Sequence, residues 1–437
     1  MNLNTSSLRE LGLDLMQERE FLKALGVFAE TVHRQPSDHR SRVLAARCYV
    51  EIGERERAVM ALHACAEGLL ARDFLLSATA ACKLALELNP HERMVLETLK
   101  RVHARAVRTA PGRAAIPPPA PPEPLGDGVV LENLMTLSGS ALAERALEVL
   151  LTPDGTVTVD LQARPPLPLF ADLSPATFVD LVVGLTLRSA GAGTVIAKEG
   201  EGGETLYVIV AGQAEVSRSV QGEVKRLGLL PGGSMFGEVS LLTGTLPSAT
   251  VTCTVESELF EIRRDLLGTL SQTHPELPPT LAQFAQQRMA KNLLVSSPLF
   301  QPLPMEDRRA LLQNFQFRGL AAGERVLVEG EHSQGLFLVL AGELVVQKDD
   351  PAGGQVTLGV LHEGDVAGEI SLITGLRATA TVAATRKTAT AFLPRSDFHQ
   401  LMRNFPSARE YLEGLSSRRL KEIGDALRPM EILDAEE

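Results

Sequence analysis

Length, composition and charge already exclude several classes of protein. With 437 residues the chain is too long for one ordinary hydrophobic core, so we expect roughly two to four domains. A net charge of -11, three Tyr and no Trp argue against a nucleic-acid-binding surface, which is usually basic and carries stacking aromatic rings. The four Cys form no C-x-x-C pair and have no His at metal-ligand spacing, so we expect neither a metal nor a bound cofactor. Three of them fall at equal intervals and should be small apolar residues on packed helix faces: Cys48, Cys65 and Cys82.

The N-terminal segment and the apolar stretches indicate where the protein resides. Residues 1–20, MNLNTSSLRELGLDLMQERE, carry charges where a signal peptide needs an apolar run. Apolar stretches such as LYVIVAG and GLFLVLAG are far shorter than a membrane-spanning helix. We therefore expect a cytoplasmic protein without a membrane span.

Residues 1–107 are typical of a domain made only of helices. Apolar residues recur at helical spacing in LRELGLDLMQEREFLKALGVFAETV, and the segment that begins at Ser7, SLRE, has the pattern of a capping box at a helix start. Turn-forming residues divide the region into about six antiparallel helices, with breaks at 35–37, near Gly53, at 72–73 and at 89–90.

A repeat within this region resembles the tetratricopeptide repeat (TPR). Leu11-Gly12, Ala24, Phe28 and Pro36 stand where that repeat has its Leu-Gly pair, its Ala, its aromatic residue and its final Pro. Small residues matter because paired helices approach closely only where side chains are short. Later units keep part of the pattern, at Ala58, Leu62, Ala78, Cys82, Ala85 and Pro90. The resemblance implies a groove that binds a partner protein; the alternative is a helical cap that packs on its own chain.

Residues 108–128, RTAPGRAAIPPPAPPEPLGDG, form a Pro/Ala-rich linker. Clustered prolines cannot donate backbone hydrogen bonds and favour the extended polyproline II conformation, so we expect a semi-rigid spacer and a separable helical domain. An SH3-type ligand is a less favoured interpretation. A connector at 129–165 follows, with a short helix around 140–150 and a strand in TVTVDL, and the sequence assigns it no role.

From Pro168 onward the sequence repeats itself. PLFADLSPATFVDLV matches PLFQPLPMEDRRALL, GAGTVIAKEGEGGETLYVIVAGQAEV matches AAGERVLVEGEHSQGLFLVLAGELVV, and LPGGSMFGEVSLLTG matches HEGDVAGEISLITG. Each copy opens with a helix, continues as short strands with Gly-rich turns and closes with a helical segment, a pattern typical of an eight-stranded jelly roll. We place the copies at 166–295 and 296–427, followed by an acidic tail at 428–437.

Both copies resemble cyclic nucleotide-binding domains, the family of the catabolite activator and of the regulatory subunits of cyclic-AMP-dependent kinase. The Glu-Gly, Ala-Gly and Gly-Glu pairs of that family occur in order, twice, at Glu199-Gly200, Ala211-Gly212 and Gly237-Glu238 and again at Glu329-Gly330, Ala341-Gly342 and Gly368-Glu369. The resemblance covers roughly residues 168–425. It implies a multidomain α + β fold, in which an all-α TPR-like region precedes two β jelly rolls with flanking helices.

In that family the Gly-Glu cassette binds the phosphate and the ribose of the ligand. A short helix that begins at Gly-Glu-x-Ser directs free backbone N–H groups at the phosphate, and the Glu accepts a hydrogen bond from the ribose 2′-OH. An Arg nine residues after the Glu pairs with the phosphate. The resemblance places the candidate site at Gly237, Glu238, Ser240 and Ser248 in the first copy and at Gly368, Glu369, Ser371, Arg377 and Thr379 in the second.

Neither copy has this Arg in place. Pro247 stands nine residues after Glu238, and Ala378 stands nine residues after Glu369, with Arg377 one residue early. Losing a charge-assisted pair to a phosphate costs on the order of 2–4 kcal/mol, or roughly 30- to 1000-fold in affinity. We therefore expect the first cassette to keep its shape without a ligand, and the second to bind cAMP or cGMP if Arg377 turns inward.

No enzymatic signature accompanies these domains. The sequence contains no kinase loops, no Walker motif and no nucleophile–base pair, and the linker lacks the paired basic residues of a kinase-inhibitory segment. The dozen or so residues after the last expected helix are too few for a winged helix-turn-helix, so we expect no nucleic-acid partner. The sequence predicts a non-enzymatic signalling adaptor that binds a protein through its helical repeat and senses a cyclic nucleotide through the second copy. A structural scaffold with two empty cassettes is the alternative, and a homo-oligomer is possible.

Overall fold

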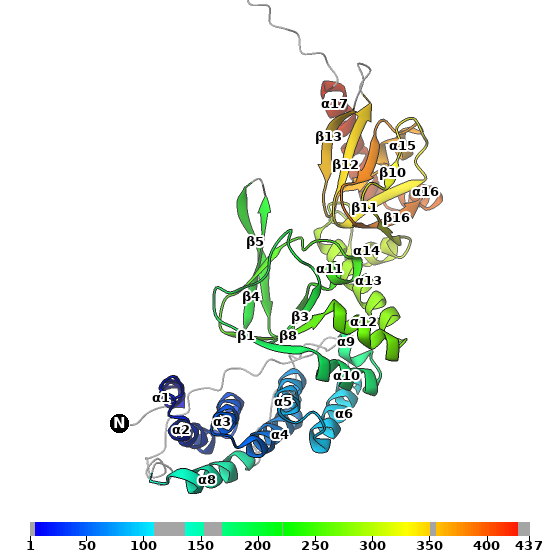
Figure 1. The fold of residues 1–437 in the computed structure, drawn as a ribbon. Helices are drawn as coiled ribbons and strands as arrows, with labels where there is room; N and C mark the ends of the chain where they lie inside the picture. The colour runs from blue at the N-terminus through cyan, green and yellow to red at the C-terminus, as the bar shows by residue number, and fades with distance from the viewer. Residues whose placement is uncertain (1–4, 109–135, 153–167, 221, 350–354, 427–437) are drawn as a thin grey trace, which may run out of the picture.

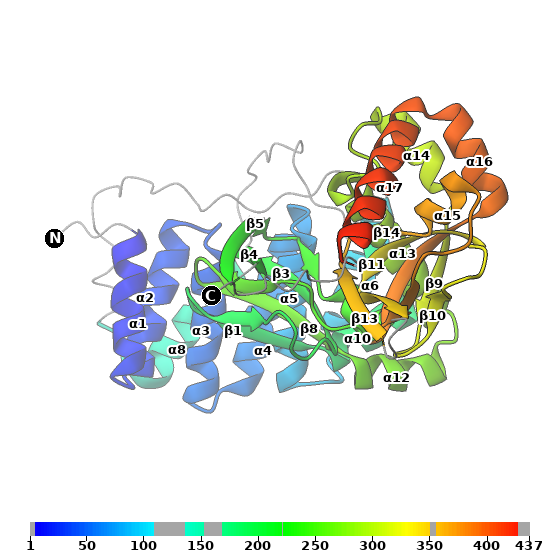
Figure 2. The ribbon, with the colours of Figure 1, turned by 90° about the horizontal axis from the view of Figure 1, so that it is seen from above.

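The chain folds as a layer of helices followed by two β-sandwiches, which confirms the expected fold class (Figure 1). The computed structural model describes residues 5–108, 136–152, 168–220, 222–349 and 355–426. Seen from above, the first sandwich lies over the helical layer and the second lies to one side (Figure 2). The predicted linker, the strand in TVTVDL and the acidic tail lie outside the described residues.

The N-terminal region consists of consecutive helices, each packed against the next. Three of the expected breaks and the region around Gly53 fall between helices, as predicted. Two expectations need correction. The first helix begins at Thr5, so Ser7 lies inside its first turn and is not its N-cap, and a further break at 18–20 includes Arg19 with φ 62°. The helices are α1 (Thr5–Gln17), α2 (Phe21–Arg34), α3 (His39–Glu51), α4 (Arg55–Ala71), α5 (Leu75–Leu88) and α6 (Arg93–Arg108).

Small residues allow these helices to pack closely. A Cβ added to Gly12 on α1 would clash with the ring of Phe28 on α2, so only glycine leaves room for this ring. Ala24 and Ala58 are completely buried, and so is Cys48, whose pKa burial raises to about 12. The close pairing agrees with the small residues of the repeat pattern, whereas the assignment to a TPR-like family stays a prediction.

The short helix expected near residue 145 is present, and it packs on the helical layer. This helix, α8 (Gly139–Leu151), lies against α2 and α4. Tyr49 donates its hydroxyl hydrogen to the Ala143 carbonyl at 2.5 Å, and Arg42 donates to the carbonyls of Leu150 and Thr152. A face of the helical layer is therefore covered by the chain itself.

The first β-sandwich contains two four-stranded antiparallel sheets, in the orders β1-β8-β3-β6 and β2-β7-β4-β5. Its strands are β1 (Thr186–Ala190), β2 (Val195–Ala197), β3 (Thr205–Ala211), β4 (Gln213–Val220), β5 (Glu223–Pro231), β6 (Met235–Phe236), β7 (Thr250–Cys253) and β8 (Ser257–Arg263). Its helices are α9 (Pro168–Ala171), α10 (Pro175–Gly184), α11 (Glu238–Thr243), α12 (Arg264–Thr273) and α13 (Leu277–Ser296). The closing segment, expected as one helical stretch, is divided in two near His274.

The second β-sandwich repeats this topology, in the orders β14-β11-β16-β9 and β10-β15-β12-β13. Its strands are β9 (Gln316–Leu320), β10 (Arg325–Leu327), β11 (Gly335–Ala341), β12 (Leu344–Asp349), β13 (Gln355–Leu361), β14 (Val366–Ala367), β15 (Thr381–Ala384) and β16 (Thr388–Pro394). Its helices are α14 (Met305–Leu312), α15 (Glu369–Thr374), α16 (Arg395–Asn404) and α17 (Pro406–Ala426). No described helix is long and apolar enough to cross a membrane.

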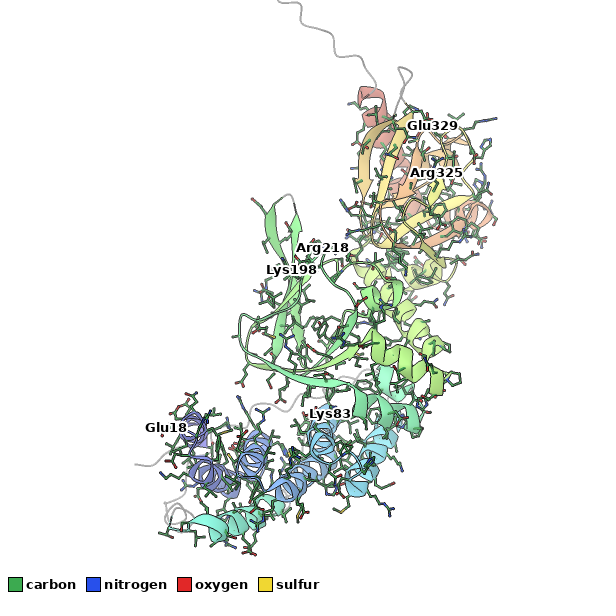
Figure 3. The ribbon with its side chains drawn as sticks, in the orientation of Figure 1. Glu18, Lys83, Lys198, Arg218, Arg325 and Glu329 are labelled. Atoms are coloured by element: carbon green, nitrogen blue, oxygen red, sulfur yellow. The ribbon has the colours of Figure 1, made fainter. Side chains whose placement is uncertain are left out.

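One hydrophobic core runs through the helical layer and the first sandwich. It extends from Phe28 through Leu99 and Phe178 to Phe260, all of which are 1% exposed or less. Lys83 on α5, at the boundary between the two parts, donates from Nζ to the Val183 carbonyl at 2.8 Å (Figure 3). The structure therefore does not support a separable helical domain, because separation would expose this core to water. The predicted domain limits at 107, 165, 295 and 427 stay predictions.

Expressing the protein as two separate chains should test whether the helical layer and the first sandwich share one core. Residues 1–108 and 136–437, coexpressed as separate chains, should assemble into one stable complex, because each contributes apolar side chains to the same core. Affinity copurification followed by size-exclusion chromatography measures the assembly. Elution of two independently folded fragments would contradict the shared core and favour the separable domain.

The partly buried His39 at the start of α3 predicts a loss of stability in acid. Burial, with the charges of Arg72 and Arg42 nearby, lowers its pKa from 6.5 to about 3. As pH falls below about 6.5 the unfolded chain takes up a proton that the folded chain does not, so stability decreases towards pH 3 by up to about 1.4 kcal/mol per unit. Urea unfolding of His39→Gln at several pH values should show a shallower acid dependence. The exposed His91→Gln is the control, and equal slopes in wild type and His39→Gln would contradict the assignment.

Candidate functional site

Each cassette begins with a residue whose backbone conformation favours glycine. Gly237 and Gly368 are the N-caps of α11 and α15, with φ of 85° and 95°. A Cβ on Gly237 would clash with the Thr205 carbonyl, and one on Gly368 would lie 2.6 Å from the Gly335 carbonyl oxygen. Both positions therefore require glycine, and the next residue, a Glu, begins a short helix at the wall of a cavity.

The two cassette carboxylates are buried, and each is paired with an Arg from a helix beyond the sandwich. Glu238 is 4% exposed and Glu369 is 1% exposed. Arg288 on α13 lies with Nε 3.2 Å from Glu238 Oε1, and Arg419 on α17 lies with Nη1 2.7 Å from Glu369 Oε1. A buried carboxylate is costly unless it is paired, and each of these Arg residues supplies that partner.

Neither Arg was expected from the sequence, although the repeat contained the signal. Each stands 50 residues after its cassette Glu, in the helical segment that closes its copy. Each also donates to the backbone carbonyl three residues before that Glu, that of Met235 in the first copy and that of Val366 in the second. A self-comparison continued past the strands would have aligned Arg288 with Arg419.

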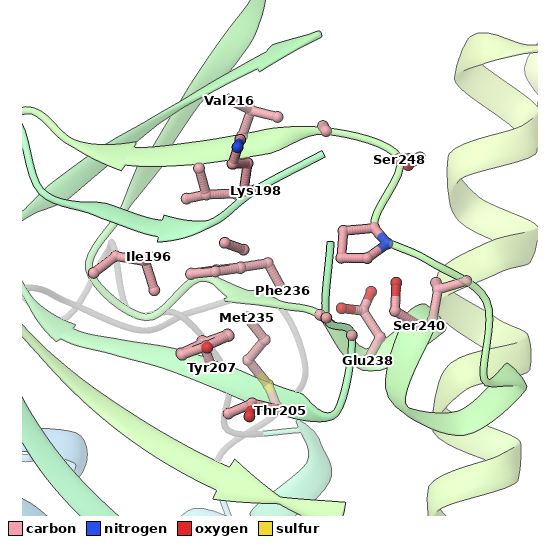
Figure 4. Close-up of a pocket in the computed structure, with 18 of the residues that line it drawn as sticks. Ile196, Lys198, Thr205, Tyr207, Val216, Met235, Phe236, Glu238, Ser240 and Ser248 are labelled. Atoms are coloured by element: carbon pink, nitrogen blue, oxygen red, sulfur yellow. The ribbon is translucent and has the colours of Figure 1, made fainter. Parts of the chain in front are cut away.

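The first cassette faces a cavity of about 1210 Å³ (Figure 4). All four candidate residues of this copy line it: Gly237, Glu238, Ser240 and Ser248. Tyr207 on β3 and Phe236 on β6 also line it, with their rings stacked at a centroid distance of 5.0 Å and an interplanar angle of 15°. Burial raises the pKa of Tyr207. The cavity thus combines a buried carboxylate with an aromatic wall.

The position that carries the phosphate-binding Arg in the family is occupied here by an apolar ring. Pro247 lines the first cavity, and its carbonyl accepts a hydrogen bond from the Gly200 N–H at 2.9 Å. Basic side chains line the cavity elsewhere, and each has a partner close by. These pairs are Lys198 with Glu201, Arg263 with Asp265, Arg264 with the Ser240 carbonyl and Arg288 with Glu238.

The second cassette faces a much smaller cavity, of about 290 Å³. Gly368, Glu369, Ser371 and Thr379 line it, together with Glu422 and Ile423 from the end of α17, which narrow it. Four of the five candidate residues of this copy line the cavity, and the fifth lies outside it.

That residue is Arg377, which is exposed and donates from Nη1 to the Gly330 carbonyl at 3.0 Å. Its neighbour Ala378 is 7% exposed, lines the cavity and donates its N–H to the Glu331 carbonyl at 2.7 Å. Because that hydrogen bond fixes the backbone, the displacement by one residue places the cation on the outer side.

The loop that follows the helix of the first cassette lies beside the second domain. Arg218 on β4 donates to the Ser248 carbonyl at 2.6 Å and pairs with Glu363 of the second sandwich at 2.7 Å (Figure 3). Next to the C-cap of α11, Gly244, lies Lys387 of the second domain: a Cβ on Gly244 would be 2.6 Å from its Nζ. The equivalent of Arg218 in the second copy, Lys348, pairs within its own sandwich. The first cassette therefore contacts the second domain directly at Gly244 and through Arg218 at Ser248.

Two segments of the chain match the family model of the cyclic nucleotide-binding domain, at residues 187–274 and 317–405. These segments contain the strands and the cassettes of the two sandwiches. The chain therefore contains two cyclic nucleotide-binding domains, as the resemblance predicts. Within the described residues, no group of His, Cys, Asp and Glu side chains is arranged to hold a metal ion.

Curated relatives and solved structures share this tandem region. Over 236 residues the chain is 28% identical to a cAMP-dependent protein kinase regulatory subunit of Blastocladiella emersonii, covering 54% of this chain and 56% of the relative. Over 244 residues it is 25% identical to cGMP-dependent protein kinase 2 of Homo sapiens, covering 55% of this chain and 30% of the relative. The regulatory domain of Toxoplasma gondii PKA, solved with cAMP, is 23% identical and covers 57% of this chain and 92% of that one, with a TM-score of 0.29. The chain thus spans about half the length of the first relative and less than a third of the second.

Removing the Arg partner of a cassette carboxylate should destabilise its domain. Arg419→Met should lower the free energy of unfolding by about 3 kcal/mol, because it leaves the charge of Glu369 buried and unpaired. The double variant Arg419→Met/Glu369→Gln should recover much of this loss. Arg418→Met, a neighbour with an exposed side chain on the same helix, is the matched control. Urea unfolding measures all three, and equal losses for Arg418→Met and Arg419→Met would contradict the role of the pair.

Proposed function

We propose that this protein is a non-enzymatic regulatory protein that senses a ribose-bearing ligand in the cavity of its first cyclic nucleotide-binding domain. The observation that carries the proposal is the difference between the two cavities, about 1210 Å³ in the first domain and about 290 Å³ in the second. Small-molecule sites usually occupy roughly 300–1,000 Å³, so the first cavity has room for a nucleotide, whereas the second is at the lower limit.

This proposal moves the ligand from the second domain, which the sequence favours, to the first. The reasons are the space beside each cassette and the position of Arg377. In the second domain, Arg377 lies outside the cavity, and Ile423 of α17 narrows the space beside the cassette. In the first domain, Glu238 is in place for a ribose hydroxyl, and its cavity is open. The kinase regulatory subunits and cGMP-dependent kinase among the relatives make cAMP and cGMP the reference ligands to test.

The contacts of α11 give the ligand state a direct connection to the second domain. Arg218 joins the Ser248 carbonyl, at the cavity, to Glu363 of the second sandwich. Val239 and Leu242 of α11 pack against the core of the second domain. A ligand that shifts α11 therefore shifts groups of the second domain, which would be the output side of the protein.

The helical layer supports the first domain in this proposal. Its core is shared with the first sandwich, and α8 covers part of another face. These contacts favour one of the two alternatives for the helical region. They fit a helical cap that packs on its own chain better than they fit a groove that binds a partner protein. A protein partner bound through the helical region and a cytoplasmic location stay predictions. The scaffold with two empty cassettes is the second candidate function.

Matched substitutions of the two cassette carboxylates should locate the site. Titration calorimetry with cAMP, cGMP, adenosine and guanosine should show saturable binding to the full chain. Glu238→Ala should weaken it roughly 10- to 100-fold by removing the ribose acceptor, whereas Glu369→Ala should leave it unchanged. With saturating ligand, amide hydrogen exchange should also change at residues 361–365, beside Glu363.

The same titrations contain the outcomes that would overturn the proposal. Binding lost in Glu369→Ala and retained in Glu238→Ala would assign the ligand to the second domain. Absence of binding by any of these ligands at millimolar concentration would favour the scaffold.

A further inference from the structure

The first cavity has side chains that suit a ribose and a base. The residue at the position of the family's phosphate-binding Arg, Pro247, carries no charge. Glu238, buried and paired with Arg288, presents a carboxylate that can accept a hydrogen bond from a ribose hydroxyl. The apolar ring of Pro247 lies where a cyclic phosphate would need a positive charge.

The first cavity has more aromatic side chains for contact with a base than the second cavity. Tyr207 and Phe236 face each other across the strand pair β3 and β6, and both line the cavity. At the same place in the second copy Phe337 faces Ala367, and only Ala367 lines the cavity. Aromatic side chains at such a wall provide apolar contact and stacking for a flat base.

From these contacts we infer that the first cavity selects an uncharged nucleoside, with a free 2′-hydroxyl, over the corresponding cyclic nucleotide. This inference rests on the proposed function and specifies its ligand. A cyclic phosphate would carry a negative charge into a partly enclosed cavity beside the carboxylate of Glu238. Of the basic side chains that line the cavity, Lys198, Arg263 and Arg288 each have a carboxylate partner, and Arg264 donates to the Ser240 carbonyl. A nucleoside keeps the ribose and base contacts and brings no charge that must leave water.

The two copies show why a cation one residue away does not replace the missing one. Leu246 corresponds to Arg377 of the second copy, is 37% exposed and does not line the cavity. Pro247 corresponds to Ala378, whose side chain does line its cavity. A positive charge at residue 247 would therefore reach the ligand, and one at residue 246 would lie outside.

This geometry supplies a test with matched variants of the full chain. Wild type should bind adenosine or guanosine at least about tenfold more tightly than cAMP or cGMP in titration calorimetry. Pro247→Arg should improve the affinity for the cyclic nucleotide relative to its nucleoside by roughly 30- to 1000-fold, because it supplies the charge-assisted pair. Leu246→Arg, which adds the same charge one residue earlier, should leave this ratio unchanged. Pro247→Ala, the residue found in the second copy, controls for the loss of the proline ring.

Each outcome separates this inference from the proposed function. If wild type binds cAMP or cGMP more tightly than the nucleosides, and Glu238→Ala abolishes that binding, the nucleoside preference is wrong and the sensor remains. If Pro247→Arg and Leu246→Arg change the ratio equally, or Pro247→Arg behaves like Pro247→Ala, the missing cation does not determine the ligand and the inference is overturned. If neither wild type nor Pro247→Arg binds any of the four ligands, the proposed function is wrong as well.

Discussion

The buried ion pair between a cassette Glu and an Arg of a later helix is the interaction on which both sandwiches depend. Glu238 and Glu369 are almost fully buried, and a buried carboxylate is costly unless it is paired. Arg288 and Arg419 supply the partner, and their second hydrogen bonds tie the closing helices to the strand before each cassette. The pair therefore anchors the cassette carboxylate inside the protein and ties the closing helix to the strand that borders the cavity.

Both domains contain this ion pair, but they differ at the residues that line the cavity from the closing helix and at one position of the cassette. In the second domain α17 continues past Arg419 and lines the cavity with Ile423. In the first domain the cavity stays large. Lys387 of the second domain lies beside Gly244 at the end of α11, and Arg218 of β4 links the Ser248 carbonyl to Glu363 of the second domain. The first cassette thus lies between its own cavity and the neighbouring domain, which suits a sensor whose state another domain reads.

The helical layer supports the first domain by packing against it. Its core continues into the first sandwich, so the first domain is supported from below by α5 and α6 and from the side by the second domain. The charge of Lys83 is buried at this boundary with two partners, the Val183 carbonyl at 2.8 Å and the Glu87 carboxylate at 3.4 Å. Independent movement of the helical layer would break such contacts together.

The sequence by itself determined the helical N-terminal region, the tandem sandwiches and the cassettes, because these follow from local periodicity, glycine turns and an internal repeat. It also showed that the family's phosphate-binding Arg is absent, since residues 247 and 378 can be compared directly. Only the tertiary structure decided that Arg377 points outward, that Arg288 and Arg419 reach the cassettes from 50 residues away, and that the helical layer shares a core with the first domain. Those outcomes depend on how distant segments pack and which side of the backbone faces a cavity, and neither is encoded in the spacing of neighbouring residues.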